Sequence, residues 1–230
     1  MNNSADSPSR PSRFPFIFRM FEPALPAAVI LTDSAEIKAK HRYWQRRVLI
    51  ATIIGYATFY FMRKNLSIAM PVLALPPEQG GLGITKANLG LFLTLHGLLY
   101  GVAKLINGLF GDRCNARTFM VAGLILSATM NMLFGLSSAV LTLGIFWMAN
   151  GWFQGMGYPP CARSMTHWIP PKELATKMSI WNASTNIGAL LILAVGGYLA
   201  MSSWRLCFFV PAAVALLCAV FIWFALPDTP

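Results

Sequence analysis

Three basic side chains interrupt apolar stretches of this sequence, at Arg63, Lys64 and Lys104. A basic side chain near the centre of a lipid-spanning helix costs about 2.5–3.5 kcal/mol on insertion scales. All eight acidic residues fall outside the apolar stretches, so none of them is placed to neutralise these charges. The planar fork of arginine binds phosphate or carboxylate oxygens in pairs, and lysine adds a point charge. The pattern therefore predicts an anionic ligand, with Arg63 as its clamp.

For the two lysines a different interpretation stays open. Lys104 lies two turns from the end of its stretch, so its ammonium group could reach the membrane surface instead. Lys64 points about 100° away from Arg63 around the helix and could face a neighbouring helix or backbone carbonyls. No such alternative fits Arg63, because the chain offers it no acidic partner within the apolar stretches.

Polar and aromatic side chains extend from these charges along single helix faces, at spacings of three to four residues. The stripes are Tyr56, Tyr60 and Arg63; His96, Tyr100 and Lys104; Asn150, Gln154 and Tyr158; and Trp181 with Thr185 and Asn182 with Asn186. Because lipid penalises each polar group, stripes on four helices predict a shared polar cavity. The alternative is interhelical hydrogen bonding that only holds the helices together.

The composition indicates which elements position these residues. Of the 230 residues 56% are hydrophobic and 11% charged, whereas a soluble domain carries about 25% charged residues. An ordinary soluble enzyme is therefore excluded, and an all-α integral membrane protein is predicted. The expected spans are 48–75, 86–110, 118–138, 140–161, 178–200 and 204–226. We expect residues 1–46 to form a cytoplasmic segment, disordered in its first part, and residues 47–230 to form the six-helix bundle.

The distribution of lysine and arginine predicts the orientation in the membrane. With a cytoplasmic N-terminus, thirteen of these residues lie on the cytoplasmic side and two, Lys86 and Arg205, on the other. Basic residues gather in cytoplasmic loops, so we expect a multi-pass protein of the inner (plasma) membrane with both termini in the cytoplasm. The net charge of +10 then needs no nucleic-acid partner, since basic and aromatic residues do not interleave in a patch.

Chemistry other than anion binding finds little support in the sequence. The four cysteines lack metal-ligand spacing, no nucleophile–base pair is visible, and no Gly-rich phosphate loop precedes a Lys-Ser or Lys-Thr pair. We therefore expect no metal, no cofactor and no enzymatic activity. Within the spans, His96 is the only side chain whose ordinary pKa lies near neutral pH. This favours anion exchange, which needs no carboxylate relay, over proton-coupled transport.

Several ordered motifs carry a family resemblance. GLFGDRCNAR at 108–117 resembles the loop between helices 2 and 3 of the major facilitator superfamily. Longer segments resemble the organophosphate:phosphate antiporters, the family of the glycerol-3-phosphate and hexose-phosphate transporters. They are GYATFYFMRKNLSIAMP at 55–71, YGVAKLINGLFGDRCNAR at 100–117, GWFQGMGYPPCARSMTHW at 151–168 and KELATKMSIWNASTNIGA at 172–189. The resemblance implies a six-helix N-terminal half of that fold.

The resemblance also implies roles for individual residues. In the family, one Arg on helix 1 and one on helix 7 clamp the substrate phosphate, and Arg63 matches the first. The other matching positions are Lys64, Lys104, Tyr56, Tyr60, Tyr100 and Gln154. The helix 5 motif Trp-Asn-x-x-His-Asn begins here with Trp181 and Asn182 but has Thr185 in place of histidine, which leaves open whether His96 supplies the imidazole. Asp112, Arg113 and Arg117 are expected to bridge helix ends in one gating state.

Carriers of this family have about twelve helices, and this chain stops at ALPDTP, where their central cytoplasmic loop begins. We expect the C-terminal six-helix half to be absent, so that a truncated half-carrier would need a complementary half. Three hypotheses remain: one half of a phosphate-ester:phosphate antiporter, a membrane sensor related to the hexose-phosphate sensor, or an inactive remnant. The expected partners are a phosphate or phosphate-ester anion and the lipid bilayer.

Overall fold

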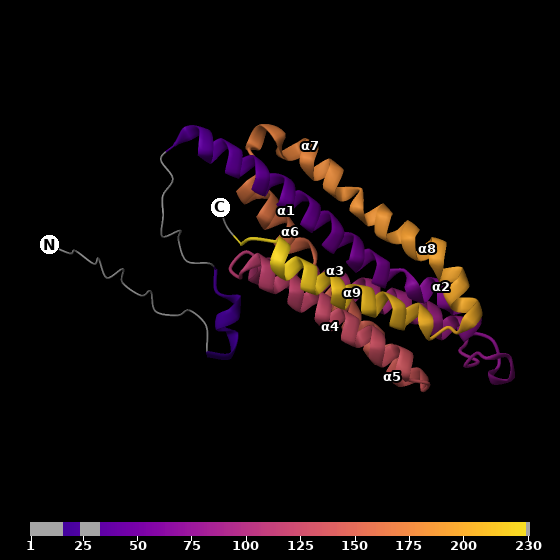
Figure 1. The fold of residues 1–230 in the computed structure, drawn as a ribbon. Coiled ribbons are helices and arrows are strands. Elements are labelled where there is room, and N and C mark those ends of the chain that lie inside the picture. Colours follow the sequence, from indigo (N-terminus) through magenta and orange to yellow (C-terminus); the bar gives the residue numbers. More distant parts are fainter. Residues whose placement is uncertain (1–15, 24–32, 229–230) are drawn as a thin grey trace.

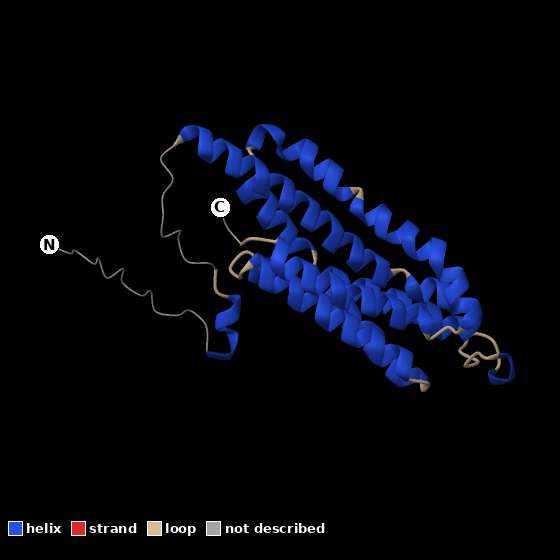
Figure 2. Ribbon diagram, in the orientation of Figure 1, coloured by secondary structure: helices blue, strands red, loops and turns tan. Residues whose placement is uncertain are grey.

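The structure is a computed structural model that describes residues 16–23 and 33–228. Within these ranges every regular element is a helix (Figure 2), as the all-α prediction requires. The expected disorder at the start of segment 1–46 falls on residues outside the described ranges. A short 3₁₀ helix, η1 (Phe16–Phe21), precedes the main bundle.

Six helical passes run along the long axis of the bundle (Figure 1). Three of them are unbroken helices, and three are each divided into two helices. The passes are α1 (Ser34–Arg63) with α2 (Asn65–Leu73), α3 (Lys86–Gly111), α4 (Ala116–Leu136), α5 (Val140–Gln154) with α6 (Tyr158–Trp168), α7 (Pro171–Asn182) with α8 (Ser184–Ser202), and α9 (Leu206–Ala225). The 3₁₀ helix η2 (Pro77–Gln79) lies in the loop between α2 and α3.

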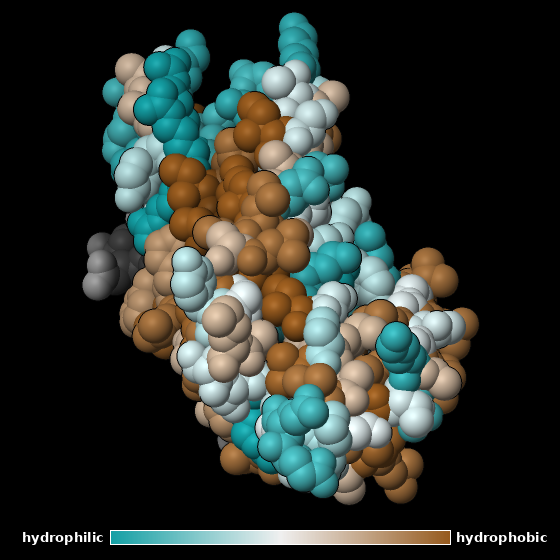
Figure 3. Space-filling model, turned by 90° about the vertical axis from the view of Figure 1, so that its right-hand side faces the viewer, coloured by the Kyte–Doolittle hydropathy of each residue, from teal (hydrophilic) through white to brown (hydrophobic). Residues whose placement is uncertain are grey.

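Four of these passes are long and apolar enough to cross a membrane by length and composition alone. They are Lys86–Gly111, Ala116–Leu136, Pro171–Ser202 and Leu206–Ala225. In the fourth pass, α5 and α6 have 15 and 11 residues, so each is too short to cross a membrane on its own. In α1, arginines flank the apolar stretch at Arg46, Arg47 and Arg63. Both passes lie in the same bundle (Figure 1), and hydrophilic residues gather toward its ends, with an apolar band between (Figure 3).

Several helices extend beyond the apolar stretches that the sequence predicts as spans. α1 begins at Ser34, well before residue 48, because Asp33 caps it by accepting a hydrogen bond from the Ala35 N–H at 2.9 Å. Such a cap satisfies a backbone donor that the helix itself leaves unpaired. Likewise, α6 continues to Trp168 and α7 already begins at Pro171. Hydropathy locates lipid contact, whereas capping and proline locate the helix ends.

The three divided passes break next to residues that the sequence predicts for the site. α1 ends at Arg63, with Lys64 at the bend, and α5 ends at Gln154. The third break, at Ala183, directly follows Asn182. Backbone irregularity at membrane depth is tolerated where it is buried in protein or lines a cavity. The breaks therefore place the candidate residues at helix ends rather than along uninterrupted helices.

Glycine allows several close approaches between helices. A Cβ on Gly155 of α5–α6 would lie 2.9 Å from the Cβ of Ala103 on α3, and one on Gly151 would lie 2.9 Å from the His96 carbonyl oxygen. Gly97 and Gly101 of α3 have the same spacing of four residues, but in the described structure they face open space. Spacing alone does not tell a packed glycine pair from an unpacked one.

Candidate functional site

Arg63, at the C-terminal end of α1, lies where α1, α3 and α5 meet. Its Nε and Nη2 atoms donate to Oε1 of Gln154 at 3.3 and 3.2 Å. Its guanidinium carbon lies 4.3 Å from the ring centroid of Tyr60 and 3.9 Å from that of Tyr100. Both distances fall within the range of cation–π attraction. An amide oxygen and two aromatic faces thus hold the arginine, and no described carboxylate forms an ion pair with it.

Aromatic rings connect this arginine to Lys104 and to α7. The Lys104 ammonium lies 4.1 Å from the ring centroid of Tyr158, which directly follows the α5–α6 break. The Tyr158 ring lies 5.8 Å from that of Trp181, and Trp181 stacks on Tyr56 at 4.6 Å. Tyr56 in turn meets Tyr60 edge to face at 5.3 Å. The structure therefore brings together the predicted residues Tyr56, Tyr60, Arg63, Tyr100, Lys104, Gln154, Tyr158 and Trp181.

Behind Arg63 lies a chain of buried amides and one hydroxyl. The Gln154 amide donates to Ser127 Oγ at 2.8 Å, and that hydroxyl donates to Asn150 Oδ1 at 2.5 Å. Asn131 donates to the same Asn150 oxygen at 3.2 Å, and Asn65, the first residue of α2, donates to Asn131 at 2.6 Å. All five side chains are fully buried. The network links the α1–α2 break to α4 and to the end of α5.

This network assigns the amide orientation of Gln154. Because its nitrogen donates to Ser127, its oxygen is left to face the guanidinium of Arg63. The sequence stripes included Asn150 and Gln154 but missed Asn65, Ser127 and Asn131. The available signal was that each neighbouring apolar helix carries a polar residue, since lipid favours burying such groups against one another. Which polar residues pair depends on how the helices are arranged, and spacing along one helix does not specify this.

Chemically, the arrangement is a cation preorganised for an oxyanion. Arg63 has five N–H donors, of which Nε and Nη2 contact Gln154. The described contacts of its guanidinium are this amide oxygen and the rings of Tyr60 and Tyr100. Aromatic faces stabilise the charge without consuming those donors. A phosphate or carboxylate group could thus replace one neutral amide oxygen at the guanidinium and gain a charge-assisted bidentate contact.

The remaining predicted substrate residues lie outside this cluster. Lys64 is exposed at the bend after α1, and Asn182 is exposed at the end of α7. The Thr185 hydroxyl donates to the Asn182 carbonyl oxygen at 2.9 Å, so it is satisfied within its own helical turn. His96 is buried between α3 and α5, with its ring stacked on Trp147 at 4.6 Å and Nδ1 3.0 Å from the Trp147 carbonyl oxygen. Its imidazole therefore packs against Trp147 rather than against the tyrosines around Arg63.

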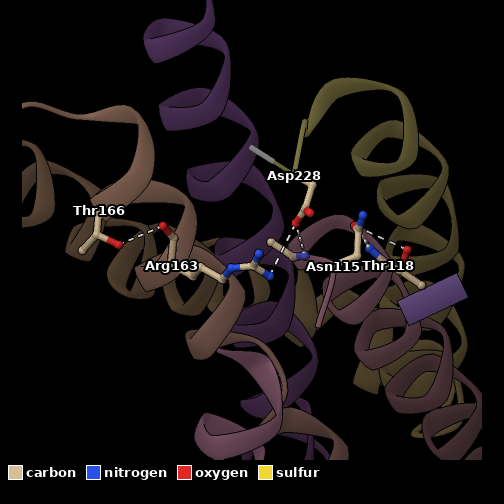
Figure 4. Close-up of polar contacts among 6 residues, drawn as sticks. Asn115, Thr118, Arg163, Thr166 and Asp228 are labelled. Atoms are coloured by element: carbon tan, nitrogen blue, oxygen red, sulfur yellow. Dashed lines mark hydrogen bonds and ion pairs between the residues drawn. The ribbon is translucent and has the colours of Figure 1, made fainter. Parts of the chain in front are cut away.

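The predicted gating residues lie near the turn between α3 and α4. Asp112 and Arg113 are exposed there, and the guanidinium of Arg117 lies 4.9 Å from the ring centroid of Trp223 on α9. In this structure a different acid joins the helix ends. Asp228, after α9, lies 3.5 Å from Arg163 on α6 and accepts the Ala116 N–H at the start of α4 at 2.8 Å (Figure 4).

The sequence could not have indicated this contact, because Asp228 lies in a short polar tail that only the fold brings back to α4 and α6. A carboxylate at the N-terminus of α4 is favourably placed, since that end carries partial positive charge. Asn115 completes the same corner by accepting the Thr118 N–H at 3.1 Å (Figure 4).

Residues 52–230 match the family model described as Major Facilitator Superfamily. The chain is 41% identical to the glycerol-3-phosphate transporter of Bacillus subtilis, over 86% of this chain and 45% of that protein. It is 38% identical to the probable hexose phosphate transport protein of Chlamydia trachomatis, over 87% and 43%, and 36% identical to the membrane sensor protein UhpC of Escherichia coli, over 88% and 45%. The chain spans less than half the length of these curated relatives.

Solved structures agree on the fold. A bacterial homologue of the human lysosomal transporter Spinster, in an inward-facing and occupied conformation, superposes with a TM-score of 0.71 at 21% identity, over 81% of this chain and 45% of that one. The proton:xylose symporter XylE superposes with a TM-score of 0.59 at 14% identity, over 82% and 46%. Together with the apolar helices, these matches show that the chain is a multi-pass membrane protein that belongs to the major facilitator superfamily.

Proposed function

We propose that this chain forms the N-terminal, substrate-binding half of an organophosphate:phosphate antiporter, working with a complementary six-helix half. The observation that carries the proposal is the geometry of Arg63, which sits between two tyrosine rings and one amide oxygen without a carboxylate partner. Such a site favours an anion with paired oxygens. The named activities of the glycerol-3-phosphate and hexose phosphate relatives support phosphate esters as the substrate class.

Transport by rocking two halves around a midplane site requires both halves. The test is therefore reconstitution of this chain in liposomes with a complementary C-terminal six-helix half from a relative, followed by measurement of inorganic phosphate exchange. Exchange that is driven by phosphate on the opposite side, and absent when this chain is omitted, supports antiport. Phosphate binding without any exchange in the completed assembly would contradict the carrier proposal.

A sensor is the second candidate function, and the similarity to the membrane sensor protein UhpC favours it. Carrier and sensor share an anion site, so binding alone does not separate them. In the exchange assay a sensor should bind phosphate esters without net turnover. Neither function requires a chemical transformation of the substrate, and we propose none.

We also propose that the chain lies in the inner (plasma) membrane with both termini cytoplasmic, as the basic residues predict. A cysteine introduced at Gln79 or Ser138 should then react with a membrane-impermeant maleimide from outside intact cells, whereas one at Lys172 should not. All three positions are exposed or half-buried at the ends of the bundle. Labelling of position 172 from outside would reverse the proposed orientation.

The native cysteines leave this labelling experiment with a low background. Cys114, Cys161, Cys207 and Cys218 are all free and buried. Cys114 lies in the turn between α3 and α4, where burial raises the pKa of its thiol. Because the thiolate is the reactive species, a raised pKa slows reaction with maleimide.

Ser127 is expected to affect substrate affinity without touching the substrate. Removing its hydroxyl in Ser127→Ala leaves the Gln154 amide without its acceptor and removes one of the two donors to Asn150 Oδ1. Buried unsatisfied groups cost about 1–3 kcal/mol. We expect phosphate affinity to rise about tenfold, because Gln154 loses its fixed orientation and no longer holds its oxygen against the Arg63 guanidinium that the anion must reach. Equilibrium binding of radiolabelled phosphate measures this.

Ser179→Ala is the matched control for this change. Its hydroxyl is exposed and donates only within its own helix, to the Ala175 carbonyl oxygen. Affinity should stay unchanged in the control. Equal affinities in Ser127→Ala and the native chain would show that the network does not position Gln154.

A further inference from the structure

A second cationic feature lies away from Arg63, in a cavity of about 220 Å³ between the N-terminal part of α1 and the start of α7. The residues that line it are Arg42, Gln45, Arg46, Leu49, Ile169, Glu173 and Lys177. We call it the α1–α7 pocket. Its lining residues lie near the starts of α1 and α7, and these starts meet at one end of the bundle (Figure 1). In the proposed orientation this is the cytoplasmic end.

The charges of the α1–α7 pocket are not balanced within the described protein. Arg42, Arg46 and Lys177 form no ion pair with another described residue, and Glu173 is the one acid in the lining. Two basic residues of α1 that lie outside the pocket have partners. Lys40 pairs with Glu36 at 2.7 Å, and Arg47 donates to the carbonyl oxygens of Phe224 and Ala225 at 2.5 and 3.0 Å. The pocket therefore has an uncompensated positive charge.

Both helices that line the α1–α7 pocket lead from it toward the Arg63 site. α1 is continuous, and Gln45 precedes Arg63 by five helical turns, so the two lie on one face. Along α7, Glu173, Lys177 and Trp181 follow at i, i+4 and i+8. At about 1.5 Å per residue, Leu49 lies roughly 20 Å from Arg63 along α1.

A pair of rings separates the pocket from the Arg63 site. Tyr56 of α1 and Trp181 of α7 stack at 4.6 Å between the two regions, and both are buried. The α1–α7 pocket thus lies at the outer end of the interface between α1 and α7. The candidate site lies farther along the same interface. A cationic cavity of this kind raises the local concentration of anions near the site.

We propose that the α1–α7 pocket is a second binding site for a phosphate-class anion, where Arg42, Arg46 and Lys177 contact phosphate oxygens before the anion passes the Tyr56–Trp181 stack. Arginine side chains suit this ligand because each presents paired donors. The ligand could be free phosphate or the headgroup of an anionic phospholipid, which share this chemistry. Its role in transport rests on the proposed function, whereas binding at the pocket does not.

The test measures binding of radiolabelled inorganic phosphate to the full chain in nanodiscs of neutral phosphatidylcholine, with chloride at constant ionic strength. We expect two classes of site. Arg63→Gln should remove one class, and Arg42→Gln/Arg46→Gln should weaken the other at least tenfold. Lys38→Gln/Lys86→Gln removes the same charge at positions outside the pocket and should leave both classes in place.

A second arm distinguishes the two sources of the anion. Nanodiscs of phosphatidylcholine and phosphatidylglycerol in equal parts are analysed by native mass spectrometry for retained lipid. If the headgroup is the ligand, phosphatidylglycerol should stay bound and block free phosphate, and the Arg42→Gln/Arg46→Gln variant should lose it. Either ligand supports the site. The proposal is overturned if neither binds, or if the control variant weakens binding equally. If the native chain binds phosphate at the α1–α7 pocket but shows no class of site that depends on Arg63, the proposed function is contradicted and the pocket proposal is supported.

Discussion

Replacing Arg63 by lysine is expected to weaken phosphate binding about a hundredfold while leaving the fold intact. The exchange conserves charge but removes the planar fork that donates to Gln154 and lies between Tyr60 and Tyr100. An ammonium group cannot make the bidentate contact. Two factors of ten correspond to about 2.8 kcal/mol, within the 2–5 kcal/mol that loss of a buried charge contact costs. Phosphate exchange by the completed assembly measures this effect.

Lys38→Arg provides the matched control, because it is the reverse charge-conserving exchange at an exposed position of the same helix. It should behave as the native chain. Helical content and thermal midpoint should agree for all three proteins, which separates loss of binding from loss of structure. Native rates of phosphate exchange in Arg63→Lys would show that Arg63 serves only to pack the helices.

The largest effect on stability is expected for Gly188→Ala. Gly188 of α8 lies against the backbone of α1, so that an added Cβ would overlap the carbonyl oxygen of Ala57 and lie 2.9 Å from the Cβ of Tyr60. Backbone cannot rotate away as a side chain can. Overpacking typically costs about 1–3 kcal/mol, and this contact belongs at the upper end. We expect a clearly lower thermal midpoint in detergent, together with weaker phosphate binding because Tyr60 is displaced.

Gly197→Ala on the same helix is the control, because its added methyl group would meet nothing within 4 Å. The four buried native cysteines provide the readout, since a thiol-reactive dye reports their exposure on unfolding. Equal midpoints for the two alanine variants would mean that α1 and α8 separate freely, contrary to the packing described above.

Much of the site was predictable because the membrane penalises polar groups so strongly. Arg63, Gln154 and the tyrosines were identified by their helical spacing and then lay together in the structure. Residues that satisfy their polar groups locally were the exceptions. The Thr185 hydroxyl bonds to the turn before it, and periodicity does not distinguish such a group from one that faces a cavity.

Other features depend on the tertiary arrangement, and no pattern in the sequence indicates them. The contact between Asp228 and Arg163 joins segments that are distant in the sequence, and the Ser127 hydroxyl gains its role only from the neighbours that α5 provides. The six passes followed from hydropathy, but the breaks after Arg63 and Gln154 did not. Hydropathy is averaged over a window longer than the break itself.

The Gln154 oxygen at Arg63 has a further consequence for exchange. It occupies the position of a ligand atom at a fixed, high effective concentration, because it is tethered to the same protein. An incoming anion must displace this internal competitor, so part of its intrinsic affinity is spent on that displacement. A departing anion is replaced at once, which spares the guanidinium from being left bare in a low-dielectric environment. In the proposed carrier, this contact limits how tightly the site holds its ligand and speeds release, so that the site can turn over.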